Sequence, residues 1–359
     1  MSYRLRKEKK SLQTPTDYKD TLASLRKVFE GMDSRNGKPL SKLTIDTYLA
    51  KIQRLHSAVT GEPINSESVT NLSWLSDPEK VVKSLRDSGL SALKDYVSPV
   101  VRLLKHQGVE QAVIDAYSKA LSGFKSDEDK VRATNQVKPD MVEKFIPYKD
   151  VCDKLDEKIK NMAKMEDDEL VYLLICVFYY LSDLIPRNDL NILKFKAKDK
   201  VNKSSPEFNY VSTQKVGAKI VPVGLVWNNY KTRDSYGQKK FGITRELSKV
   251  LVEYIRRWGK LNDDFVFTDR NNKPFTKSNM GDLLRSATQH ILGERQSVNL
   301  IRRTIISDFK DTPHSIEEED AMANRFLHSA SKQREYFTKE FSKNYKKPKA
   351  SDDDSGDED

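Results

Sequence analysis

The apolar positions in the first third of the chain recur at the spacing of helices. From residue 15 to about residue 124 they fall every three or four residues, as in Leu25 and Phe29 and again in Ile52 and Leu55, so each segment has one apolar face. No segment in this range shows the strict alternation that is typical of a half-buried strand. We therefore expect a small helical bundle over residues 15–124.

Two residues in this range set expectations for helix ends. Ser41 precedes the second apolar stripe, and serine is favoured at a helix N-cap. Pro99 lies inside the apolar segment that includes Tyr96 and Val101. Because proline cannot donate a helical hydrogen bond and its ring crowds the preceding turn, we expect it to kink or divide that helix.

The pattern changes after residue 124. Residues 125–140 are polar and charged with few apolar positions, which indicates a linker between two domains. Residues 170–181 are apolar nearly all round, as in a buried helix. Short β-rich runs follow at residues 208–211, 220–226 and 239–243. Helical patterns then close the chain, the last of them over residues 331–341. The predicted fold class is mainly α with a small β-sheet (α+β), in which a helical domain precedes a second domain at 141–345.

The net charge of the chain indicates a class of binding partner. The 63 lysines and arginines exceed the 53 acids, for a net charge of +10. The last eight residues, DDDSGDED, hold six of the acids, so the remainder carries +16. A basic body of this kind is the electrostatic footprint of a nucleic-acid-binding protein, although a merely soluble basic protein has the same composition. Residues 1–14 form a basic arm suited to phosphates, and residues 346–359 form an acidic tail.

The cysteines, the first residues and the apolar runs indicate the cellular compartment. The two cysteines, Cys152 and Cys176, form no disulfide framework or metal-ligand spacing, which fits a reducing intracellular compartment. The basic start of the chain does not resemble a signal peptide. The longest apolar run, 170–181, is too short to span a bilayer. We therefore expect an intracellular protein without a membrane partner.

An arginine, a histidine and a tyrosine near the C-terminal end form an unusual combination of side chains. The run NLIRRTIISDF places Arg302 on an apolar helical pattern, and the run RFLHSASKQREYF carries His328 and Tyr336. An arginine can hold a phosphate with two parallel hydrogen bonds. A histidine can donate to a phosphate oxygen or move a proton, and a tyrosine hydroxyl can attack phosphorus. A C-terminal helix pair with surface arginines and one buried histidine is the alternative interpretation of these residues.

The order of these residues along the chain resembles the tyrosine recombinase (phage integrase) family, whose catalytic pattern is Arg, Lys, His-x-x-Arg, His or Trp, and Tyr. The segments LIPRNDLNIL, NNYKTRDSYGQKKFGI, NLIRRT and LHSASKQREYF carry the resemblance, which covers residues 146 to 345. The motifs YKT…YG and LHSA before a tyrosine are most similar to integrases of large eukaryotic DNA viruses and virophages. The corresponding positions are Arg187, Lys231, Asn299, Arg302, His328 and Tyr336.

This sequence departs from the family pattern at two places. Asn299 stands where the family usually has its first histidine, and the interval from His328 to Tyr336 is one residue shorter than in common bacterial members. Asparagine can hydrogen-bond but cannot titrate, so Asn299 would position groups rather than shuttle protons. Arg303 falls at a position expected to support the backbone or contact DNA.

The resemblance implies site-specific recombination through a 3′-phosphotyrosyl bond. Tyr336 would be the nucleophile, Arg187 and Arg302 would neutralise the phosphate, and His328 would donate a further hydrogen bond. Lys231, expected near a hairpin turn, would protonate the departing 5′ oxygen. Asp189, two residues after Arg187, is expected to orient that arginine.

The resemblance also implies an organisation and partners. Residues 15–124 would be a core-binding domain that clamps DNA together with the catalytic domain at 141–345. Double-stranded DNA would be the substrate, a homotetramer on two DNA sites the assembly, and neither a cofactor, a metal nor a small-molecule substrate is expected. For a viral enzyme, the setting would be the host nucleus or a cytoplasmic viral factory.

Two other classes remain open at this point. A type IB DNA topoisomerase uses a similar residue set, and Ser331-Lys332 approaches its Ser-Lys-x-x-Tyr signature, with Tyr336 one residue too far on. A non-catalytic DNA-binding or packaging protein could keep the same fold. Supercoil relaxation without partner DNA would indicate the first, and a Tyr336 that never links to DNA would indicate the second. Tyr345, within NYKKPK, is the rival nucleophile.

Overall fold

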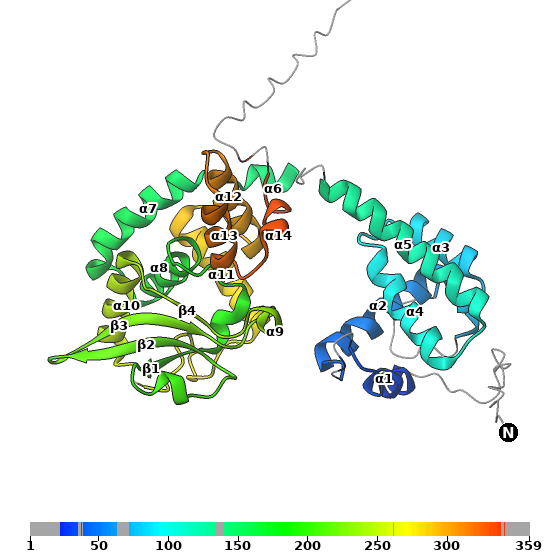
Figure 1. The fold of residues 1–359 in the computed structure, drawn as a ribbon, viewed down its shortest axis with the longest axis horizontal. Helices are drawn as coiled ribbons and strands as arrows, with labels where there is room; N and C mark the ends of the chain where they lie inside the picture. The colour runs from blue at the N-terminus through cyan, green and yellow to red at the C-terminus, as the bar shows by residue number, and fades with distance from the viewer. Residues whose placement is uncertain are drawn as a thin grey trace, which may run out of the picture. The chain divides into compact units, whose positions relative to one another are not determined.

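The computed structural model describes residues 22–34, 37, 39–62, 72–133, 139–260, 262–338 and 341. The chain divides into two compact units, residues 1–134 and 135–359. The described part is mainly helical with one four-stranded sheet (Figure 1), so the predicted fold class is confirmed. The basic arm, Tyr345 and the acidic tail lie outside the described residues. Across the described ranges, no helix combines the length and apolar character needed to cross a membrane.

The first unit is a helical bundle. Its described α-helices are α1 (Leu22–Glu30), α2 (Lys42–Thr60), α3 (Pro78–Asp87), α4 (Lys94–Gln107) and α5 (Gln111–Ala133). Their apolar faces meet in one core that contains Phe29, Ile52 and Tyr117. Ser41 caps α2 as predicted, since its hydroxyl accepts a hydrogen bond of 3.2 Å from the N–H of Thr44.

Pro99 does not divide its helix, although division is one of the two outcomes expected for it. Helix α4 runs unbroken from Lys94 to Gln107 with Pro99 inside it. Proline removes one backbone hydrogen bond there, but Val97, Val100 and Leu104 of the same helix are completely buried. The burial of this apolar face outweighs the missing bond.

The expected linker is helical over its first half. Helix α5 continues through residues 125–133, which the polar composition had assigned to the linker. Lysine, arginine and glutamate are good helix formers on an exposed face, and an ion pair between Lys94 and Glu128 ties this extension to α4. The division between the two units falls just beyond it, after Thr134.

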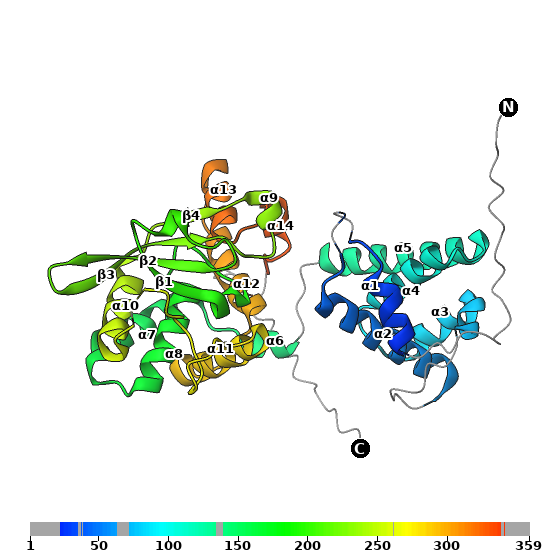
Figure 2. The same cartoon turned by 90° about the horizontal axis from the view of Figure 1, so that it is seen from below.

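The second unit packs helices against a small mixed sheet. Its helices are α6 (Pro139–Glu143), α7 (Tyr148–Asn161), α8 (Asp167–Tyr180), α9 (Arg233–Tyr236), α10 (Arg245–Trp258), α11 (Lys277–Leu292), α12 (Val298–Lys310), α13 (Ile316–Arg325) and α14 (Ala330–Arg334). Helices α7, α8, α10 and α11 lie on one side of the sheet (Figure 2). Helix α8 is buried as predicted, with Leu173, Ile175 and Tyr179 fully covered.

The sheet has the strand order β1-β2-β3-β4. Its strands are β1 (Leu193–Ala197), β2 (Asn209–Val216), β3 (Lys219–Trp227) and β4 (Lys239–Phe241). The strand β1 pairs in parallel with β2, and the other neighbours are antiparallel. The three predicted β-rich runs fall on β2, β3 and β4. Strand β1 was missed, although its sequence LKFKA alternates apolar and polar residues.

The β2–β3 and β3–β4 connections lie at opposite ends of the sheet. The strands β2 and β3 join through a tight turn at Gly217, which has the left-handed φ of 60° that glycine adopts easily. The strands β3 and β4 join through residues 228–238, which include α9. Figures 1 and 2 show the β2–β3 turn projecting away from α9 and α14.

Candidate active site

Arg187 lies just beyond the buried helix α8, at the start of a short 3₁₀ turn. The hydroxyl of Tyr179 in α8 donates a hydrogen bond to the Arg187 carbonyl and so fixes its backbone. The Nη2 atom of Arg187 donates to the hydroxyl oxygen of Tyr336 at 3.4 Å. This contact joins residues 149 positions apart and places a cation beside the phenol oxygen.

The turn before Arg187 is fastened to the end of α13, the helix that leads to His328. The Ile185 N–H donates to the Arg325 carbonyl at 2.8 Å, and Nη2 of Arg325 donates to the Ser182 carbonyl at 2.9 Å. Two segments that carry predicted site residues are therefore held together by one backbone and one side-chain hydrogen bond.

Asp189, which is expected to orient Arg187, forms no hydrogen bond with it within the described residues, although their charges interact. Its carboxylate lies 3.6 Å from Nζ of Lys277, at the start of α11. Burial raises the pKa of Asp189, while Lys277 and then Arg187 oppose this shift. The long side chain of Lys277 reaches the carboxylate because α11 packs on the turn that contains Asp189. Nothing near Lys277 in the sequence marks this pairing.

Arg302 is almost completely buried, with 1% of its surface exposed. Its Nη2 atom donates to the carbonyls of Ile185 at 3.1 Å and Phe326 at 2.9 Å. The guanidinium also lies over the ring of Tyr336, 5.7 Å from its centroid. This arginine therefore links the turn before Arg187, the end of α13 and the predicted nucleophile.

The buried guanidinium of Arg302 keeps unused donors. Its Nε and Nη1 atoms have no hydrogen-bond partner among the described residues. Burial, and then the positive charge of Arg187, lower the pKa of Arg302 to about 10. A buried cation with unpaired N–H groups is costly, and an anion that accepts from them would remove much of that cost.

His328 follows a sharp turn at the end of α13, where Leu327 has a left-handed φ of 53°. Its ring stacks on Tyr336 with centroids 5.5 Å apart. Both ring nitrogens are buried and have no hydrogen-bond partner within the described ranges. Burial, followed by the charges of Arg302 and Arg187, lowers the pKa of His328 to about 3, so the ring is neutral at pH 7.

Tyr336 lies just after α14 rather than inside a longer helix. The expected helix over 331–341 is wrong, because α14 ends at Arg334. The N–H of Thr338 donates to the hydroxyl of Ser307 in α12 at 2.9 Å instead of to a helical carbonyl. Tyr336 is half-buried and faces Arg187, Arg302 and His328.

Lys231 and Asn299 are not joined to this group by side-chain contacts. Lys231 is exposed in the β3–β4 connection and makes no hydrogen bond or ion pair with the described residues. Its neighbour Thr232, however, donates to the Leu327 carbonyl at 2.8 Å, next to His328. Asn299 is exposed in the first turn of α12, one turn before Arg302. On a helix such positions share a face.

Two lysines at the β2–β3 turn are poorer candidates than Lys231. Lys215 and Lys219 flank the β2–β3 turn. The other end of these strands is tied to the turn after Arg187, since Nδ2 of Asn209 donates to the Asp189 carbonyl at 3.3 Å. Strand β2 has eight residues, and at about 3.3 Å a residue it separates the two ends by about 25 Å.

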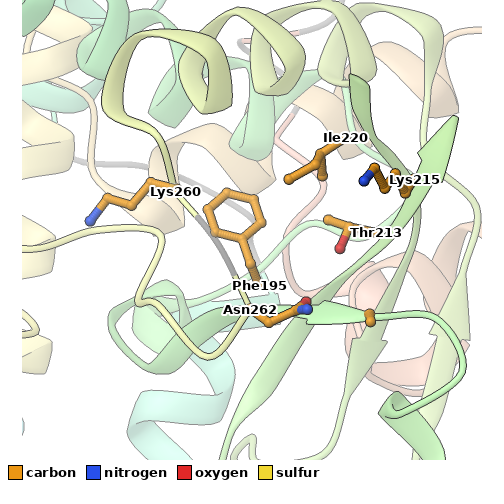
Figure 3. Close-up of a pocket in the computed structure, with 7 residues that line it drawn as sticks. Phe195, Thr213, Lys215, Ile220, Lys260 and Asn262 are labelled. Carbon is orange, nitrogen blue, oxygen red and sulfur yellow. The ribbon is translucent and has the colours of Figure 1, made fainter. Parts of the chain in front are cut away.

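A separate cavity of about 410 Å³ opens on the sheet (Figure 3). It is lined by residues that include Phe195, Thr213, Lys215 and Lys260. None of the six predicted site residues lines it, so the cavity does not belong to the candidate site.

The structure thus places Arg187, Arg302, His328 and Tyr336 together, and leaves Lys231 and Asn299 nearby without direct contacts. The sequence analysis missed the residues that hold the chain beyond Tyr336, chiefly Ser307 and Thr338. Small hydroxyl side chains are common, and only their long-range pairing distinguishes these two.

No family model and no curated protein matches this chain. Among solved structures it is similar to the crystal structure of XerA recombinase, with 12% sequence identity and a TM-score of 0.30. The match covers 88% of this chain and 92% of that chain. A likeness of this size carries no conclusion about function.

Proposed function

We propose that this protein is a tyrosine recombinase that cuts and rejoins double-stranded DNA. One observation carries the proposal: a tyrosine hydroxyl lies 3.4 Å from Arg187 in a cluster where Arg302 and His328 keep unpaired, buried polar atoms. These atoms have the chemistry to bind an anion with several oxygens. The hydroxyl oxygen of Tyr336 lies beside them, since it accepts a hydrogen bond from Arg187 and its ring contacts Arg302 and His328.

The proposed reaction is a transesterification at a DNA phosphate. The phenol oxygen of Tyr336 forms a bond to phosphorus as the bond to the 5′ oxygen breaks. The phenol releases its proton to solvent, and the departing 5′ oxygen takes up a proton from Lys231. The products are a 3′-phosphotyrosyl link and a free 5′-hydroxyl, and attack by a 5′-hydroxyl of another strand reverses the step.

Each cluster residue has a role in this step. Arg302 and Arg187 offset the negative charge that builds on the phosphate oxygens. His328 is neutral and holds one N–H, which can donate to such an oxygen. Lys231 supplies the proton to the 5′ oxygen, and its exposed position next to the Thr232–Leu327 bond supports this role. Asn299 positions groups near Arg302.

The biological reaction is proposed on the sequence resemblance. The similarity to integrases of large DNA viruses and virophages favours integration of a viral genome, with a homotetramer on two DNA sites. The basic body, +16 without the acidic end, supports a duplex DNA substrate.

A nicked duplex that loses a short fragment after cleavage tests the proposal. Once cut, it cannot be resealed, so the covalent adduct accumulates and is seen as a slow band on a denaturing gel. Wild-type protein should form the adduct, and Tyr336→Phe should abolish it while duplex affinity stays within a few-fold. An adduct with Tyr336→Phe would transfer the role to another residue, with Tyr345 as the first candidate. No adduct with wild-type protein on any duplex would leave a non-catalytic DNA-binding protein.

A further inference from the structure

The chain immediately after Tyr336 is held by hydrogen bonds to α12. Thr338 is completely buried. Its hydroxyl accepts a hydrogen bond of 2.7 Å from Nη1 of Arg303 and lies 3.5 Å from the Tyr336 carbonyl. Its N–H donates to the hydroxyl of Ser307, which is also fully buried, at 2.9 Å. Both the backbone and the side chain of Thr338 are therefore fixed, two residues beyond the predicted nucleophile.

Helix α12 supplies both halves of this arrangement. Arg303 and Ser307 are four residues apart and share one face of the helix. Arg302 points about 100° away from Arg303, into the cluster with Tyr336. A single rigid element therefore holds a candidate phosphate ligand on one face and the backbone of the candidate nucleophile on another.

A second contact fixes the same segment farther on. The ring of Phe341 is buried and stacks on that of Phe145, with centroids 4.1 Å apart and planes within 4°. The segment after Tyr336 is thus seated on its own catalytic unit. Without these contacts, the backbone at Tyr336 would depend on the five-residue helix α14, which is too short to be stable by itself, and on the side-chain contacts of Tyr336 with its cluster.

We propose that Arg303 is a positioning residue that acts through Thr338 to hold Tyr336 at the phosphate site of its own chain. This inference rests on the proposed function and adds a specific role for Arg303. The guanidinium fixes the Thr338 hydroxyl, and the hydroxyl fixes the backbone next to the Tyr336 carbonyl. Arg303 itself touches no reacting atom.

Single-turnover cleavage of the nicked duplex tests this role. Arg303→Ala and Thr338→Val should each slow adduct formation by roughly 10- to 100-fold, because a small displacement of a nucleophile has effects of that order. Duplex affinity should not change. Thr338→Ser keeps the hydroxyl and should restore most of the rate. Arg256→Ala removes an arginine that is 66% exposed and paired with Glu253 on α10, and serves as the matched control.

The double variant Arg303→Ala/Thr338→Val should be no slower than the worse single variant, because both remove the same contact. Multiplied losses would contradict the proposal, and so would wild-type rates in both single variants. If Arg303→Ala instead weakens duplex binding and lowers its salt dependence by about one phosphate contact, Arg303 is a DNA ligand and the proposal fails.

An external nucleophile separates positioning from phosphate binding and from misfolding. In a Tyr336→Phe background, hydrogen peroxide can attack the phosphate in place of the phenol. Adding Arg303→Ala should then leave the peroxide-driven cleavage rate unchanged, whereas Arg302→Ala should abolish it. An equal loss with Arg303→Ala would overturn the proposal.

Amide hydrogen exchange reports on the same contact without any reaction. Exchange over residues 336–338 should be faster in Arg303→Ala and Thr338→Val than in the wild type, and unchanged in Arg256→Ala. Should wild-type protein form no adduct, the proposed function fails, and this measurement still decides whether Arg303 holds the segment. Unchanged exchange in both variants would overturn the inference by itself.

Discussion

Single residues in this protein show how burial changes the chemistry of a charged group. Arg302 is 1% exposed and uses one nitrogen to bind two carbonyls, while its other two nitrogens have no partner in the described structure. Its charge in turn helps to keep His328 neutral. The two residues are therefore electrostatically coupled, and each defines the state in which the other meets a phosphate.

Arg302 should not be replaceable by lysine. We expect Arg302→Ala to stop strand cleavage with a modest loss of duplex binding, and Arg302→Lys to be severely impaired. A lysine carries its three N–H groups on one nitrogen, so it cannot reproduce the planar fork in which Nη2 binds two carbonyls while Nε and Nη1 stay available for a phosphate. Single-turnover cleavage on the nicked duplex measures both, and near-normal cleavage by Arg302→Lys would show that charge alone suffices.

The pKa of His328 should respond to the charge of Arg302. In the free wild-type protein the ring should stay neutral between pH 5 and 8, since its pKa lies at about 3. Arg302→Ala removes a positive charge and should raise this pKa, without returning it to 6.5, because burial is the larger cause. Histidine-labelled protein followed by NMR across this range gives the titration.

The lowered pKa of His328 also makes the stability of the folded protein depend on pH. The unfolded chain binds a proton on this histidine near pH 6.5 and the folded chain only near pH 3. The neutral ring's contribution to stability is therefore present above pH 6.5 and is lost as the pH falls towards 3. A His328 signal that titrates near pH 6.5 in the wild-type protein would contradict both statements.

At the scale of elements, periodicity predicted more of this fold than position-specific signals did. The helical bundle, the buried helix α8 and strands β2 to β4 follow from apolar spacing that is dense and local. The short strand β1 and the helical continuation of α5 were missed, because one depends on pairing with β2 and the other on a charged face packed beside α4.

In the candidate site, too, local signals in the sequence were readable and contacts between distant segments were not. Arg187, Arg302, His328 and Tyr336 could be chosen from motifs, and their assignment as catalytic stays a prediction. The ion pair of Asp189 with Lys277 could not be predicted from the sequence, and neither could the hydrogen bond from the Thr338 N–H to the Ser307 hydroxyl. These contacts join segments far apart in the sequence, and each uses residue types that are abundant in this chain.

The β3–β4 connection carries the prediction that belongs to this scale. Lys231→Ala should slow cleavage of an ordinary duplex, because the departing 5′ oxygen then lacks its proton donor. A 5′ sulfur leaves readily as a thiolate without taking up a proton. A substrate with sulfur in place of that 5′ oxygen should therefore be cut by Lys231→Ala at close to the wild-type rate. Lys219→Ala, at the far end of the sheet, is the matched control. A defect on both substrates would assign Lys231 a binding role instead.

At the scale of the whole molecule, opposite charges are concentrated in different parts of the chain. The body carries +16, and six acids lie within the last eight residues. These acids are outside the described residues, so their influence has to be measured in solution. A polyanionic segment competes with DNA phosphates for basic side chains.

Deleting residues 351–359 should therefore tighten non-specific duplex binding and steepen its dependence on salt concentration. Binding isotherms at several salt concentrations, for the full chain and the deletion, give both quantities. A variant with the six acids changed to asparagine and glutamine keeps the length and should behave like the deletion. Identical binding of all three proteins at low salt would reduce the acidic end to a solubility segment.

In the DNA-free protein, the unpaired N–H groups of Arg302 are still available to bind an anion. Any small oxyanion that fits between Arg302, His328 and Tyr336 lowers the free energy of the folded state and not of the unfolded chain. Sulfate or phosphate in a buffer would then raise the melting temperature and, at the same concentrations, act as a competitive inhibitor of DNA cleavage. Thermal stability and catalytic competence of this protein would accordingly vary in opposite directions with the choice of anion.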